Sequence, residues 1–149
     1  MPRLVLAGLL LAMAAGQLSN PGGFVDIVAS YDLGGTAVAR VGAAALITGE
    51  LIAAVGLVSR DTSRRHRATS VALAVALTWS LLAAQAFARG LTLDNCGCFG
   101  VHLAQPLRWW ILVEDLEFVA LAWWVRARHA TVAAPYSPRA GAPERPRVS

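Results

Sequence analysis

Long apolar segments separated by short polar connectors make up most of this chain of 149 residues. Four segments come close to the length of about 20 residues that a helix needs to cross a bilayer. They cover residues 4–18, 36–58, 68–88 and 107–125. The pattern predicts an all-α fold, a transmembrane bundle of four helices, in one domain of residues 1–130.

The first apolar segment is the shortest and leaves an alternative open. A positive residue precedes it and small residues close it, as in a cleaved signal peptide. Gly8, Ala12 and Gly16 recur every four residues, which instead favours a retained helix that packs closely against its neighbours. The second segment has a similar series of small residues, spaced by three or four, at Gly42, Ala45, Gly49, Ala53 and Gly56.

The connector after the first segment carries a helical pattern of its own. Residues 20–23 form a turn signal, and apolar residues then dominate positions 24–31, with Asp26 and Asp32 interleaved. We expect a short amphipathic helix at the outer interface, covering the bundle beside the connector 89–106.

The C-terminal end of the chain has a different composition. Residues 131–149 combine proline, arginine, glycine and serine with few large apolar side chains. Such a segment has too little apolar surface to fold, so we predict a disordered cytoplasmic tail.

Composition and charge indicate a membrane protein and its orientation. Hydrophobic residues make up 56% of the chain and charged residues 15%, too apolar for an ordinary soluble domain. Arginines gather between Arg60 and Arg67 and again from Arg126 onward, and the positive-inside rule places both groups in the cytoplasm. We expect a multi-pass protein of a bacterial cytoplasmic membrane, with both termini in the cytoplasm and connectors 19–35 and 89–106 outside. The net charge of +4 then reflects topology, with no nucleic-acid partner.

Tryptophans mark the ends of the fourth apolar segment. Pairs at positions 109–110 and 123–124 bracket it, as interfacial aromatic belts do. Trp79 lies in the middle of the third segment, where we expect it to pack between helices.

The two cysteines of the chain, Cys96 and Cys98, stand one residue apart in the sequence Asn95–Gly100. A disulfide between them would contribute only about 1.6 kcal/mol by loop closure, against about 3 kcal/mol for a loop of fifteen residues. Such a disulfide would stabilise the fold only slightly and is easily reduced, so we predict that the pair undergoes dithiol–disulfide exchange. A static loop disulfide, or two thiols without a role, is the alternative.

Residues that flank the pair suggest further chemistry. Arg89, His102 and Arg108 are candidates for stabilising a reactive thiolate, whereas Asp94 would act in the opposite sense. The two cysteines together with His102 are also plausible soft metal ligands, above all for Cu(I). Without a clear fourth ligand, we assign no metal.

Acidic residues inside the predicted spans form a second set of candidates. They are Glu50, Glu114, Asp115 and Glu117. Buried charge in a bilayer is costly, so such residues usually carry function or a paired charge. Because reduction of a disulfide to two thiols takes up two protons, these acids are candidates for a proton relay. Structural pairing with Gln17, Gln85 or Arg40 is the alternative.

The run Cys96-Gly97-Cys98-Phe99-Gly100, followed by an apolar span with Glu114-Asp115, is the most specific motif of the chain. With Glu50 in the second span and the outer segment 24–33, it resembles the MauE family of methylamine-utilisation membrane proteins, within the DoxX-like group of four-helix membrane proteins. The resemblance covers about residues 4–127. Related proteins often have lysine where this chain has Gln17, and aspartate where it has Asn95.

This resemblance implies a redox-associated membrane protein that works with a thioredoxin-like partner outside the cytoplasm. The family is associated with maturation of a disulfide-rich periplasmic amine dehydrogenase. On this hypothesis one cysteine forms a mixed disulfide with the partner and the other resolves it. A quinone or a cytoplasmic thiol system would carry electrons onward, because the chain has no second cysteine pair. A membrane anchor without turnover and a copper-handling protein remain alternatives.

Overall fold

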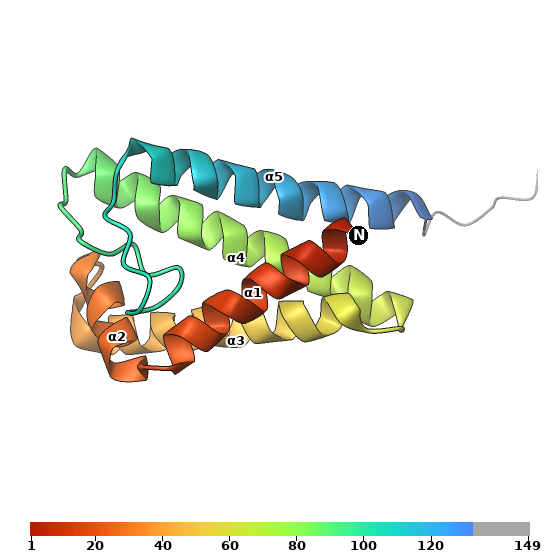
Figure 1. Cartoon of the computed structure of the whole chain (residues 1–149), viewed down its shortest axis with the longest axis horizontal. Coiled ribbons are helices and arrows are strands. Elements are labelled where there is room, and N and C mark those ends of the chain that lie inside the picture. Colours follow the sequence, from red (N-terminus) through yellow and green to blue (C-terminus); the bar gives the residue numbers. More distant parts are fainter. Residues whose placement is uncertain (133–149) are drawn as a thin grey trace, which may run out of the picture.

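The computed structural model describes residues 1–132, with side chains to residue 128, and this part of the chain holds five helices and no strand (Figure 1). They are α1 (Pro2–Leu18), α2 (Pro21–Ser30), α3 (Gly35–Val58), α4 (Thr62–Ala88) and α5 (Trp109–Val132). The all-α prediction is confirmed, and each predicted apolar segment is a helix. Helix α5 extends two residues into the predicted tail, whose remainder, residues 133–149, lies outside the described residues.

The prediction of four separate spans is only partly confirmed. Helices α3 and α4 are each long and apolar enough to cross a membrane. Helices α1 and α2 meet that criterion only together, as a pair bent by 100°. Helix α5 carries Glu114, Asp115 and Glu117 close together among its apolar residues, and its crossing stays a prediction.

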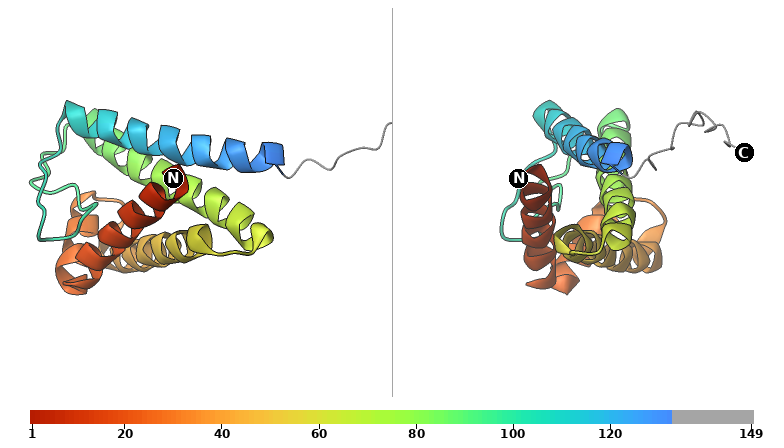
Figure 2. Two further views of the ribbon diagram at one scale, coloured as in Figure 1. Left: turned by 45° about the vertical axis from the view of Figure 1, so that its right-hand side comes forward. Right: turned by 90° about the vertical axis from the view of Figure 1, so that its right-hand side faces the viewer.

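The four long helices form a ring in the order α1, α3, α4, α5 (Figure 2, right). Extensive packing joins α1 to α3, α3 to α4, and α4 to α5, whereas α1 and α5 make little contact. The ring therefore closes with a loose seam between α1 and α5. The sequence pattern alone does not give this order.

The bend between α1 and α2 is built by local capping. The side chain of Asn20 accepts a hydrogen bond from the backbone N–H of Gly23 at 3.0 Å, and Pro21 occupies the first helical position. Helix α2 then packs on α3 with Phe24 and Val28 buried and Asp26 exposed. The predicted short amphipathic helix is therefore confirmed.

Small residues have different roles on the two helices where they recur. On α3 the prediction of close packing is confirmed: a methyl group at Gly49 would lie 2.9 Å from Cγ2 of Val75, and one at Gly56 would lie 2.5 Å from Cβ of Ala68. On α1 it is wrong for Gly8, which has nothing within 4 Å of an added methyl group. Ala12 is exposed as well.

Replacing Gly56 with alanine should destabilise the bundle, because α4 has no room for the added methyl group. We expect Gly56→Ala to lower the free energy of unfolding by about 1–3 kcal/mol. The matched control Gly8→Ala should be neutral or stabilising by up to about 1 kcal/mol, because alanine is the better helix former. Thermal unfolding in detergent measures both, and equal midpoints for the two variants would contradict the packing.

Candidate functional site

The connector between α4 and α5 folds back over the end of the bundle and lies against α2 (Figure 1). Two backbone hydrogen bonds join the first and last parts of this connector. Leu107 N–H donates to the carbonyl of Leu93 at 2.8 Å, and Cys96 N–H donates to the carbonyl of Gln105 at 2.8 Å. The cysteine motif therefore sits in a pinned loop.

Asn95 organises the turn that carries the two cysteines. Its side-chain oxygen accepts a hydrogen bond from Gly97 N–H at 2.9 Å, and its side-chain amide donates to the carbonyl of Gly100 at 2.9 Å. An aspartate at this position would supply the first bond but not the second, because an ionised carboxylate has no donor. The turn around Cys98 is thus closed at both ends by one side chain.

Glycines allow this turn to touch the helices beneath it. Gly97 has φ +89° and a methyl group there would lie 2.7 Å from Cγ2 of Ile27 on α2. Gly100, at φ +71°, and Gly16 of α1 lie backbone against backbone, so that a methyl group at either would collide with a carbonyl group of the other segment. The close contact predicted for Gly16 is made with this loop and not with a neighbouring helix.

Two buried side chains hold the carbonyl groups of the cysteines. The hydroxyl of Tyr31, just after α2, donates to the carbonyl of Cys96 at 2.7 Å. The side-chain amide of Gln17 on α1 donates to the carbonyl of Cys98 at 3.1 Å. Burial raises the pKa of Tyr31 above its ordinary value, so this phenol remains a donor at physiological pH.

The cysteines are free thiols in close contact. Their Sγ atoms lie 3.7 Å apart, and Cys96 Sγ lies 3.9 Å from the side-chain oxygen of Gln105. Cys96 is 2% exposed, whereas Cys98 is half-buried. The pair is therefore placed for dithiol–disulfide chemistry, and Cys98 is the more exposed residue of the two.

The contact between the two thiols makes their pKa values unequal. A hydrogen bond from Cys98 lowers the pKa of Cys96 to about 7 despite the opposing effect of burial. The same hydrogen bond, with burial added, raises the pKa of Cys98 well above its ordinary value. Cys96 is thus the sulfur that carries negative charge near neutral pH.

Both cysteines line a cavity of about 180 Å³ at the loose seam between α1 and α5. Its walls combine apolar side chains from α1 and α5 with a few polar groups, which are those of Gln105, Glu114 and Asp115. Asp115 is 6% exposed, and its charge acts on both thiols, raising their pKa values. Asp115 therefore shares an enclosed space with the sulfurs.

The four candidate acids lie in different surroundings. Asp115 and Glu50 are buried, whereas Glu114 lines the cavity from an exposed position and Glu117 is exposed outside its lining. Helix α5 thus turns Asp115, and in part Glu114, toward the cysteines, whereas Glu117 points elsewhere.

Glu50 is the centre of a buried polar network. Its Oε1 accepts hydrogen bonds from the side-chain amide of Gln17 and from the indole N–H of Trp79, both at 3.0 Å. The pairing predicted with Gln17 is thereby observed, and Trp79 is buried as expected, with a polar contact in addition. Glu50 Oε2 and Gln17 Oε1 are buried without a hydrogen-bond partner among the described residues.

The three flanking cations lie away from this network. Arg89 donates to the carboxylate of Asp32 at 2.8 Å and to Gln85 at 3.1 Å, and the guanidinium of Arg108 lies over the ring of Trp110. His102 is exposed. Arg40, which was a predicted partner for the acids inside the spans, is exposed too.

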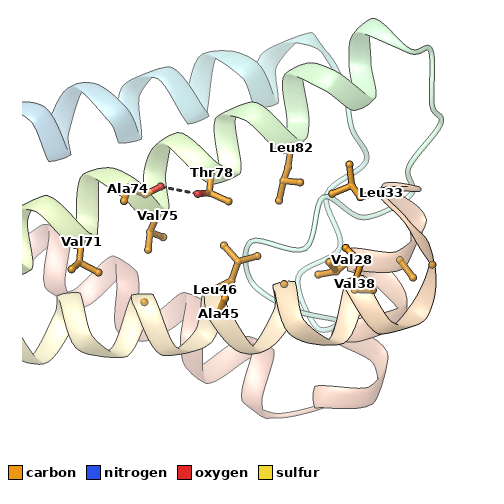
Figure 3. A pocket seen from close by; sticks show the side chains of 15 residues that line it. Val28, Leu33, Val38, Ala45, Leu46, Val71, Ala74, Val75, Thr78 and Leu82 are labelled. Carbon is orange, nitrogen blue, oxygen red and sulfur yellow. Dashed lines mark hydrogen bonds between the residues drawn. The ribbon is translucent and has the colours of Figure 1, made fainter.

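Within residues 1–128, no three side chains of the His, Cys, Asp and Glu types gather in an arrangement that could hold a metal ion. His102 is accordingly not grouped with the two cysteines. A second cavity, of about 390 Å³ between α2, α3 and α4, is almost wholly apolar (Figure 3). Its hydroxyl group, that of Thr78, donates to the carbonyl of Ala74 at 2.8 Å.

Three residues of the site were not predicted from the sequence to be functional. Tyr31 appeared there only as part of an amphipathic pattern, Gln17 only as a partner for an acid, and Gln105 not at all. A polar residue near the end of an apolar helix, as at Gln17, is the signal that could have indicated a contact to the loop. The contacts of Tyr31 and Gln105 depend on long-range folding.

The family model for methylamine utilisation protein MauE matches residues 1–128. The chain belongs to the MauE family. This match contains every residue of the site described above. A relative in this family, methylamine utilization protein MauE of Paracoccus denitrificans, is 33% identical over 120 residues. The aligned region is 80% of this chain and spans 63% of that relative's length. No solved structure matches the chain.

The unequal thiols predict a titration near neutral pH. Ultraviolet absorbance of the reduced protein should show one thiolate forming as pH rises through about 7, because the pKa of Cys96 is lowered. In Cys98→Ala this step should move to higher pH, since the hydrogen bond that favours the thiolate is lost. Cys96→Ala should show no thiolate near neutral pH. A neutral titration that persists in Cys96→Ala would contradict the assignment.

Proposed function

We propose that this member of the MauE family is a membrane thiol–disulfide exchange protein that reacts through Cys96 and Cys98. The observation that carries the proposal is the pair of sulfurs 3.7 Å apart at the wall of a small cavity shared with Asp115. A loop built only to connect helices needs neither the pinned turn nor the buried carboxyl group beside it.

The exchange is a two-step transfer of one disulfide. A thiolate of the partner attacks Sγ of oxidised Cys98, forms a mixed disulfide and releases Cys96 as a thiolate. A second partner thiol then attacks the mixed disulfide and releases Cys98. The partner's dithiol is oxidised, and the pair takes up two electrons and two protons; the reverse sequence oxidises the pair. Cys96 suits the leaving role because a thiol of lower pKa leaves faster.

Protons must reach or leave the sulfurs in this exchange. Asp115 shares the cavity with both sulfurs and is the proposed immediate proton carrier. The side-chain amide of Gln17 bridges Glu50 and the carbonyl of Cys98. Oε2 of Glu50 has no hydrogen-bond partner among the described residues, so it can take up a proton. We assign Glu50 a supporting role in the same relay, with Glu114 at the cavity entrance.

The partner and setting of the exchange follow the family. We propose a thioredoxin-like protein outside the cytoplasm, with the cysteine loop on that side of a bacterial cytoplasmic membrane and the arginine-rich connector on the other. The name of the family refers to methylamine utilisation, so maturation of a secreted protein such as an amine dehydrogenase is the proposed biological role.

Single-cysteine variants should capture the partner unequally. In intact cells, Cys96→Ser should accumulate a mixed disulfide through Cys98, because Cys96 is the thiol that, in the reverse direction, attacks Cys98 Sγ and releases the partner. Cys98→Ser should yield severalfold less adduct, because Cys96 is 2% exposed. Alkylation trapping followed by non-reducing electrophoresis measures both. The double variant is the control for adducts that do not involve either cysteine. Absence of any adduct in both single variants refutes the exchange. A stronger adduct in Cys98→Ser would show that Cys96, and not Cys98, forms the mixed disulfide.

Glu50 variants separate its structural role from its proton role. Glu50→Gln keeps an oxygen to accept from Gln17 and Trp79, so we expect wild-type thermal stability but slower redox cycling of the pair. Glu50→Leu leaves two buried donors unpaired and should cost about 2 kcal/mol or more of stability. Normal cycling in a stable Glu50→Gln protein would remove Glu50 from the relay.

A further inference from the structure

A basic cavity lies at the end of the bundle opposite the cysteine loop. There α1 and α4 begin and α5 approaches its end, since residues from the starts of α1 and α4 and from the last part of α5 line the same cavity. The cavity has a volume of about 370 Å³. Arg3, Arg65 and Arg128 line it together with Thr62 and Val125, and no acidic residue among those that the structure describes belongs to its lining.

The three arginines come from three different helices, so only the folded bundle brings them together. Arg65 is held in place because its Nη2 donates to the carbonyl of Arg60 at 3.2 Å and to the hydroxyl of Thr62 at 3.4 Å. Its Nε is buried and has no hydrogen-bond partner among the described residues. A buried guanidinium N–H without an acceptor is costly, which indicates that an acceptor beyond the described residues belongs there.

The neighbouring charges favour an anion. The positive ends of the dipoles of α1 and α4 lie at the cavity, and the start of α1 has no side-chain cap. Asp61, the acid nearest in sequence, caps α4 through Ser63 N–H and pairs with Arg64 at 3.6 Å. That carboxylate is therefore engaged with groups other than the three cavity arginines.

Side chains beside the cavity indicate the source of the anion. The guanidinium of Arg128 lies over the ring of Trp124, 3.9 Å from its centroid. Trp123 and Trp124 are exposed on the same part of α5, where an aromatic belt would mark the depth of lipid headgroups. Val125 adds an apolar wall beside the charges.

We propose that this cavity binds a phosphate group, presented by the headgroup of an anionic phospholipid. Guanidinium groups match phosphate oxygens through paired N–H donors, and basic pockets between membrane helices suit such headgroups. The site holds α1, α4 and α5 together at the end where they splay, and it is independent of the thiol chemistry at the other end.

Lipid binding to the purified full chain in detergent tests the proposal. Native mass spectrometry should show phosphatidylglycerol retained at least about tenfold more tightly than phosphatidylcholine. Arg65→Gln should abolish this preference, and Arg3→Gln should weaken it severalfold in case Arg65→Gln disturbs the start of α4. Arg60→Gln is the matched control, because it removes the same charge from the same end without lining the cavity.

The outcomes separate a built site from a generally basic surface. Equal retention of the two lipids by the wild type, or an equal loss in Arg60→Gln and Arg65→Gln, overturns the proposal. Inorganic phosphate serves as a competitor for the same atoms. If phosphate displaces the lipid, and only when Arg65 is present, the result supports phosphate recognition and adds the free anion as a ligand. If the lipid is retained, the result supports the headgroup as the ligand.

Discussion

One side-chain amide connects the membrane core of this protein to its reactive loop. Gln17 uses both of its N–H donors, one on the buried carboxyl group of Glu50 and one on the carbonyl of Cys98. Because Trp79 donates to the same oxygen of Glu50, the network joins α1, α3, α4 and the cysteine loop. Buried polar groups are costly unless paired, so these helices must keep one mutual rotation.

That constraint explains how a short loop is held rigidly above a membrane bundle. The backbones of Gly16 and Gly100 meet without side chains between them, and Tyr31 holds the carbonyl of Cys96 from the other side. The turn has little freedom left, and the sulfurs face the seam where α1 and α5 pack loosely. For the proposed exchange, a firm support beside an open seam would let a partner's thiol reach the cysteine pair.

The two ends of the bundle have contrasting chemistry. At one end, two thiols and a buried carboxyl group share a small cavity, and their unequal acidity comes from mutual hydrogen bonding and burial. At the other end, three arginines from three helices surround a larger cavity, and within the described part of the chain no acid lines it. Membership of the MauE family concerns the whole of this frame, since the match runs over residues 1–128.

The sequence by itself determined the helices, including the short helix α2, and the connector that holds the cysteines. These features depend on the lengths of apolar segments and on nearby capping residues such as Asn20, which act locally. Only the tertiary structure decided that Asp115 and not Glu117 meets the sulfurs, and that Gly16 meets a loop while Gly8 meets nothing. Neighbouring helical positions differ by about 100° of rotation, so a small turn of the helix changes which side chain enters the site. That rotation is set by contacts between residues far apart in the chain, such as Gln17 with Cys98.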